Sequence, residues 1–133
     1  VDKTSLSPAE RQIVLLTVSY ENTCHYCMAA HSTLAGGAGV DAATLTALRN
    51  GAPLPDARQE ALARFTRTLV RERGYASDAE IKAFLDAGYT KANIFDVITA
   101  TALKTISNYA NHIAETPVDA PFQAQTWAKP AAA

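Results

Sequence analysis

The sequence predicts an all-α fold. Apolar residues recur at intervals of three and four along most of the chain, as on one face of a helix. Ser, Asp or Thr precedes most of these runs, as expected of residues that cap helix N-termini. No segment shows the strict alternation of a half-buried strand. With 133 residues, 48% of them hydrophobic, we expect a single domain over residues 1–133, built as a bundle of about six helices.

The first helix is expected to be central. Ser7-Pro8 with Glu10 forms a capping box with proline at the first helical position. The residues from Ile13 to Val18 follow almost without a polar break, and a helix that is apolar all round is buried. Residues 21–23 (Glu-Asn-Thr) interrupt it.

The second helix carries both cysteines. Asn22 and Thr23 are the expected N-caps, which places Cys24 in the first turn, and Gly36-Gly37 should end the helix. The positive end of the helix dipole favours an anion there. We therefore expect the Cys24 thiol to ionise more readily than a free thiol.

Four more helices follow, each with a start and a stop signal. The pairs of expected N-cap and terminator are Asp41 with Gly51, Asp56 with Gly74, Ser77 with Gly88, and Thr90 with Pro117. The last helix carries one stripe made of Ile94, Val97, Ile98, Thr101, Ala102, Thr105, Ile106, Tyr109 and Ile113. Residues 118–133 form an extended C-terminal tail without periodicity. Its Phe122 and Trp127 are expected to lie on the body of the protein or on a neighbouring subunit.

Charge and composition exclude several classes of protein. With 12 basic and 13 acidic residues and no basic cluster, neither a nucleic acid nor a membrane surface is an expected partner. The arginines at 64, 67, 71 and 73, with Glu72 among them and Glu60 just before them, indicate a solvated helix face. There is no signal-peptide pattern, no membrane-spanning run and only two cysteines, so we expect a cytoplasmic protein.

The residues Cys24-His25-Tyr26-Cys27, with His31 four positions on, carry the chemistry. In a helix, Cys24, Cys27 and His31 lie at i, i+3 and i+7 and share one face. The two sulfurs are then close enough to bridge, since one-turn neighbours approach to roughly 5–6 Å. A bridge that closes so small a loop constrains the unfolded chain little, which favours a reversible dithiol over a structural disulfide.

Two other interpretations stay open for the pair. The cysteines can be reduced core residues packed like small hydrophobes. Zinc would need two further ligands, and the chain offers only three histidines and no second Cys-x-x-Cys, so no metal or other cofactor is predicted.

His25 points off the face of the cysteines. Asn108 and His112, one turn apart, indicate a hydrogen-bonded helix face.

The run from Gln12 to Ser32, with Cys-x-Tyr-Cys-x-Ala-Ala-His-Ser as its most specific part, resembles the alkylhydroperoxidase D-like, carboxymuconolactone decarboxylase family. The resemblance implies an all-helical fold, homo-oligomers (trimers or hexamers) and a dithiol that reduces peroxides. It also implies that Cys27 attacks, that Cys24 resolves and that His31 belongs to a proton relay.

One departure concerns the relay. Peroxidases of the family have a glutamate twelve residues before the first cysteine, where this chain has Gln12, whose amide cannot carry a proton as a carboxylate does. Glu10 and Glu21 are nearby in sequence, and Glu21, one turn before the cysteine helix, is the carboxylate that could substitute. The candidate relay residues are therefore Gln12, Glu21 and His25, beside the catalytic Cys24, Cys27 and His31.

The sequence thus predicts a thiol-dependent peroxidase or dithiol–disulfide oxidoreductase. Its substrate would be a hydroperoxide or a small-molecule disulfide, and an external thiol reductant would restore the dithiol. Two alternatives remain. One is a non-redox, small-molecule- or partner-binding helical oligomer, suggested by Gln12. The other is a lactone- or carboxylate-processing enzyme with His31 as acid and base.

Overall fold

The computed structural model describes residues 2–131, and these residues confirm the all-α fold. They form six α-helices and two short 3₁₀ segments. The α-helices are α1 (Pro8–Glu21), α2 (His25–Ala35), α3 (Ala42–Asn50), α4 (Ala57–Arg71), α5 (Asp78–Asp86) and α6 (Lys91–Ala114); the 3₁₀ segments are η1 (Gly36–Ala38) and η2 (Ala120–Gln125).

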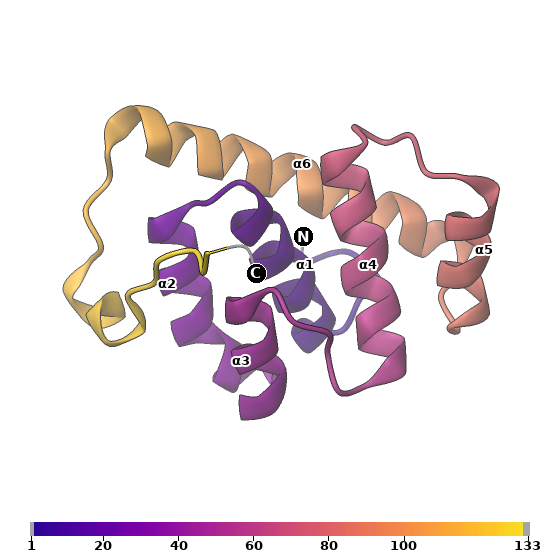
Figure 1. Ribbon diagram of the computed structural model, residues 1–133, viewed down its shortest axis with the longest axis horizontal. Helices are drawn as coiled ribbons and strands as arrows, with labels where there is room; N and C mark the ends of the chain where they lie inside the picture. The colour runs from indigo at the N-terminus through magenta and orange to yellow at the C-terminus, as the bar shows by residue number, and fades with distance from the viewer. Residues whose placement is uncertain (1, 132–133) are drawn as a thin grey trace.

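Helix α1 is the centre of the packing, as its apolar sequence predicts. It contacts α2, α3, α4 and α6, and Figure 1 shows it between α2 and α4 with α6 passing along one side. Ile13, Val14 and Leu16 have no exposed surface. The capping box of Ser7 and Glu10 is present at its start. The helix that holds the core together therefore also supplies the wall behind α2.

Most of the predicted helix caps are confirmed. Asp41, Asp56, Ser77 and Thr90 each accept a hydrogen bond from the backbone N–H three residues on. Helix α4, however, ends at Arg71 rather than at Gly74. The chain already leaves the helix at Arg73, which has a left-handed backbone with φ of 53°.

The predicted start of α2 is wrong by one or two residues. Asn22 is the C-cap of α1, and Thr23 has a left-handed backbone with φ of 52°, so neither can cap α2. Cys24 is itself the N-cap, and its sulfur accepts the backbone N–H of Cys27 at 3.4 Å. The sharp reversal at Thr23 replaces the polar cap that the sequence suggested.

Helix α6 presents its predicted apolar stripe mostly outward, which the stripe alone does not reveal. Of the stripe, Val97 is buried, whereas Ile106 is 69% and Ile113 88% exposed. The inward face of α6 instead carries Asn93, Val97, Ala100, Lys104 and Asn108. Figure 1 shows α6 along the edge of the molecule, with one side against the other helices and the other free. Among the described residues, no helix is both long and apolar enough to cross a bilayer.

The described part of the C-terminal tail, residues 118–131, packs on the body of its own chain. It is not extended throughout, because residues 120–125 form η2, which lies against α2. Trp127 is buried beside the ring of Tyr20, and its Nε1–H donates to the carbonyl of Arg49 at 2.8 Å. Phe122 meets Tyr26 edge-on. The tail therefore covers the outer side of the cysteine helix.

Candidate dithiol site

The two cysteines lie together at the start of α2. Both are free thiols, and only 1% of Cys24 and 2% of Cys27 is exposed. The Cys24 thiol hydrogen-bonds the sulfur of Cys27. The sequence predicted this proximity from the one-turn spacing. The pair is buried under polar groups of α6 and not in hydrocarbon alone.

Cys27 is held as a thiolate. The hydrogen bond from Cys24 is the largest cause, and with Ser107, Asn108 and the charge of Lys104 it outweighs burial and lowers the pKa of Cys27 to about 5. Ser107 Oγ lies 3.6 Å from Cys27 Sγ. A thiol with this pKa is ionised at neutral pH and can act as a nucleophile.

Cys24 behaves in the opposite way, and the expectation of an easily ionised Cys24 was wrong. Its hydrogen bond to the Cys27 sulfur, together with burial, raises the pKa of Cys24 far above that of a free thiol. The positive end of the helix dipole would lower the pKa of Cys24, but the neighbouring Cys27 sulfur raises it by more. The reason is that two thiolates side by side would repel each other. At neutral pH the pair therefore carries one proton, which is bound to Cys24.

His31 faces α1 and meets the residue that replaces the family glutamate. Its Nδ1 lies 3.0 Å from Oε1 of Gln12, so an Nδ1–H can donate to the amide oxygen. Burial, reinforced by the charge of Lys104, lowers the pKa of His31 to about 4. At neutral pH the imidazole is uncharged. It cannot supply the positive charge beside the thiolate.

The other two candidate relay residues lie elsewhere. The carboxylate of Glu21 accepts two hydrogen bonds from Arg71, at 2.8 and 2.9 Å, and lies 4.0 Å from Arg67. His25 is exposed, with its ring 5.8 Å from that of Trp127. Of the three predicted relay residues, only Gln12 reaches His31.

Helix α6 contributes residues that the sequence reasoning missed. Asn111 donates to Cys27 Sγ at 3.4 Å, and Lys104 donates to Ser107 Oγ at 3.4 Å. Lys104, Ser107, Asn108 and Asn111 are spaced i, i+3, i+4 and i+7, a polar stripe that could have been recognised within the apolar helix.

The structural, hydrogen-bonded role predicted for this part of α6 is confirmed for Asn108. Asn108 is completely buried, where it accepts from Asn22 at 3.0 Å and donates to Ser19 at 3.2 Å. His112 is exposed beside the ring of Tyr109. Asn108 therefore ties α6 to α1, whereas His112 is exposed one turn further toward the end of the helix.

Comparison with known proteins bears on this arrangement. The carboxymuconolactone decarboxylase family profile matches residues 1–67, half of the chain, and this span includes Gln12, both cysteines and His31. The chain belongs to the carboxymuconolactone decarboxylase family. Lys104 and the rest of α6 lie outside the matched span. No curated protein matches the sequence.

Two solved structures share the fold of this family member. An uncharacterized peroxidase-related protein from Silicibacter sp. TM1040 has a TM-score of 0.81 at 24% identity, covering 94% of this chain and 66% of that one. An uncharacterized peroxidase-related protein from Ralstonia eutropha JMP134, described as an alkylhydroperoxidase AhpD core, has a TM-score of 0.77 at 22% identity, covering 90% and 65%. The chain therefore spans slightly less than two thirds of the length of each.

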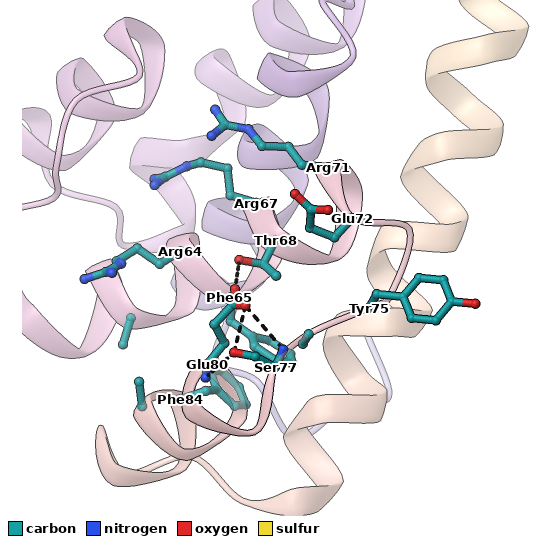
Figure 2. Close-up of a pocket in the computed structure, with 13 residues that line it drawn as sticks. Arg64, Phe65, Arg67, Thr68, Arg71, Glu72, Tyr75, Ser77, Glu80 and Phe84 are labelled. Atoms are coloured by element: carbon teal, nitrogen blue, oxygen red, sulfur yellow. Dashed lines mark hydrogen bonds between the residues drawn. The ribbon is translucent and has the colours of Figure 1, made fainter.

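A pocket lies between α4 and α5, away from the sulfurs. Its volume is about 570 Å³, and its lining includes Phe65, Phe84 and three arginines but none of the predicted site residues. Figure 2 shows the arginines along one wall and Glu80, bonded to Thr68 and Ser77, in the middle. Two of the arginines, at 67 and 71, pair with carboxylates, so their charge is largely neutralised. The arginine-rich helix face predicted from the sequence therefore has part of its positive charge paired with glutamates.

The described residues offer no ready metal site. Within residues 2–131, no three His, Cys, Asp or Glu side chains are grouped so that they could hold one ion. The immediate neighbours of the sulfur pair on α6 are hydroxyl, amide and ammonium groups. These groups stabilise an anion, whereas a zinc site needs further thiolate, imidazole or carboxylate ligands.

Proposed function

We propose that this family member is a thiol-dependent peroxidase that reduces small hydroperoxides with Cys27 and Cys24. One observation carries the proposal: Cys27 has a pKa of about 5, while its neighbour one turn away retains its proton. An ionised attacking sulfur beside a protonated second sulfur is the arrangement that a two-cysteine reduction needs. The description of two structural neighbours as peroxidase-related is consistent with it.

The reaction would proceed in two balanced steps. The Cys27 thiolate attacks the terminal oxygen of the hydroperoxide, the O–O bond breaks, and the alkoxide takes up a proton to leave as an alcohol, giving a Cys27 sulfenic acid. The sulfur of Cys24 then attacks Cys27 Sγ. The S–S bond forms as the S–OH bond breaks, and the Cys24 proton leaves with the hydroxyl group as water. An external dithiol reduces the bridge and is itself oxidised.

The burial of the pair bears on substrate size. With 2% of Cys27 exposed, a bulky protein disulfide could not reach the sulfur without a large movement of α6. A hydroperoxide with a small organic group, or a small-molecule disulfide, fits this restriction better. The proton for the leaving alkoxide would not come from Gln12, whose amide has no acidic proton.

The outward face of α6 supports a homo-oligomer as part of the proposal. Its exposed large side chains are Phe95, Ile98, Leu103, Ile106, Tyr109 and Ile113. Apolar side chains gathered on one face are typical of a protein–protein interface. We therefore propose that the chain forms a trimer or hexamer. We also propose a cytoplasmic location, where thiols stay reduced.

The decisive experiment counts free thiols after exposure to a small organic hydroperoxide. The wild type should lose both thiols and form the Cys24–Cys27 disulfide, and a dithiol reductant should restore them. Cys27→Ser should leave Cys24 unmodified. Cys24→Ser should stop at the Cys27 sulfenic acid. Unchanged thiols in the folded wild type after prolonged exposure would refute the proposal.

Gln12 favours one alternative, a non-redox binding protein that kept the scaffold. Its amide occupies the relay position beside His31, so the loss of a carboxylate there could have accompanied the loss of turnover. Catalytic turnover that disappears in Cys27→Ser would exclude this alternative. A lactone-processing enzyme using the neutral His31 as a base would instead retain its activity without either thiol.

A further inference from the structure

A buried lysine faces the sulfur pair from the opposite helix. Lys104 lies on the inward face of α6, and only 8% of it is exposed. Its Nζ donates to Ser107 Oγ at 3.4 Å, and that oxygen lies 3.6 Å from Cys27 Sγ. The ammonium is therefore one hydroxyl group away from the sulfur.

Within the described part of the chain, Lys104 has no carboxylate partner. None of the ion pairs formed within residues 2–131 includes it, although Arg58, Arg67 and Arg71 of α4 are paired with glutamates. A buried ammonium without an opposite charge is costly, and burial does lower the pKa of Lys104. The two cysteine sulfurs act in the opposite direction, with Cys27 the stronger. The negative charge that balances this lysine is the thiolate.

Within residues 2–131, the other basic groups near the cysteines are directed elsewhere: Lys129 donates to Thr23 Oγ1 at 3.5 Å and lies over the Tyr20 ring, and the exposed His25 packs on Trp127. On α1, Gln12 is a neutral amide. On α2, His31 is uncharged near neutral pH, and Tyr26, whose hydroxyl donates to Asp119 on the tail side, is held neutral by a raised pKa. On α6, the remaining neighbours are Ser107, Asn108 and Asn111, which are all uncharged. Among the described residues, Lys104 is thus the cation of the site.

We propose that Lys104 is the counter-ion of the Cys27 thiolate and positions it through the hydroxyl of Ser107. Lys104 is a positioning residue, since its ammonium acts on the sulfur across Ser107. This assignment deepens the proposed function and rests on it, because a stabilised thiolate matters for activity only if Cys27 reacts as an anion. It also suggests how a chain with glutamine at position 12 keeps an ionised nucleophile: the charge comes from α6, outside the span that matches the family profile.

The test is the pH dependence of Cys27 alkylation, with the labelled cysteine identified by peptide mass spectrometry. Lys104→Met keeps the length and removes the charge, Lys104→Arg keeps the charge, and Lys91→Met removes an exposed lysine from the same helix as a control. We expect Lys104→Met to raise the midpoint by about one pH unit or more, a roughly tenfold loss of thiolate on the acid side. Lys104→Arg should return the midpoint toward that of the wild type, and Lys91→Met should not move it.

An unchanged midpoint in folded Lys104→Met would overturn the proposal, as would an equal rise in Lys104→Met and Lys104→Arg, which would indicate a packing effect. If Lys104→Met does not fold, Lys104→Gln is measured, and the same two outcomes decide. Alkylation needs no peroxide, so the two proposals can fail separately. A shifted midpoint without peroxide-dependent thiol loss would refute the peroxidase function alone.

Discussion

The two faces of α6 reverse the usual distribution of polar and apolar residues. The inward face carries Lys104 and Asn108, which are 8% and 0% exposed, whereas the outward face carries Ile106, which is 69% exposed. The buried polar groups contact the sulfur pair and α1, whereas the apolar groups of the outward face are exposed in the single chain. On the proposed function, the inward face belongs to the dithiol site and the outward face to an interface between copies of the chain.

The largest expected effect is on the outward face. Ile106→Glu should reduce the association of copies by on the order of a hundredfold or more, because an unpaired charge is costly to bury in an interface. The mass in solution, measured by light scattering across a concentration series, should fall toward that of one chain. The alkylation midpoint of Cys27 should stay as in the wild type. Leu34→Glu, at an exposed leucine on α2, is the control and should not change the mass. A wild type that is already monomeric would contradict the assignment of this face.

The next effect is on the inward face. Asn108→Ala leaves Asn22 and Ser19 without a partner in the core and opens a small cavity. The free energy of unfolding should drop by about 2 kcal/mol, measured by urea denaturation. Lys91→Ala, at an exposed position of the same helix, should change it by less than about 0.5 kcal/mol. Equal losses in the two variants would mean that the inward polar stripe does not hold α6 to α1.

The third effect concerns the charge at position 12. Gln12→Glu places a carboxylate where the amide oxygen now lies, 3.0 Å from His31 Nδ1. A negative charge at this distance favours the imidazolium, so the pKa of His31 should rise from about 4 by roughly 1–3 units. Titration of the imidazole signals by NMR measures the rise, and Gln12→Leu, which adds no charge, should not produce it. An unchanged pKa in Gln12→Glu would mean that position 12 does not control His31.

The sequence was sufficient for the helices and for the pair of sulfurs, since these depend on local signals. Caps such as Asp41 and Ser77 act within one turn, and the spacing of Cys24 and Cys27 is fixed by helix geometry. The roles within the site depend on tertiary contacts instead. Which sulfur ionises is decided by the hydrogen bond from the Cys24 thiol to Cys27 and by polar side chains of α6, about 80 residues away in sequence.

Two further features could not be predicted from spacing. Glu21 is close to the cysteines in sequence, yet Arg71, fifty residues away, binds its carboxylate. The apolar period of α6 predicts a helix, but a period does not state which side faces the core. Here the polar stripe at Lys104 and Asn108 faces inward, because buried polar groups are stable where each has a partner.

The most direct test of the central claim is the rate of thiol loss with a small hydroperoxide, measured as a function of pH in single turnover. On the proposed mechanism the reacting species is the Cys27 thiolate, so the rate should be nearly constant at neutral pH and should fall as the pH drops through about 5. A rate that instead increases tenfold for each pH unit up to about 8.5, as for an ordinary thiol, would contradict the account.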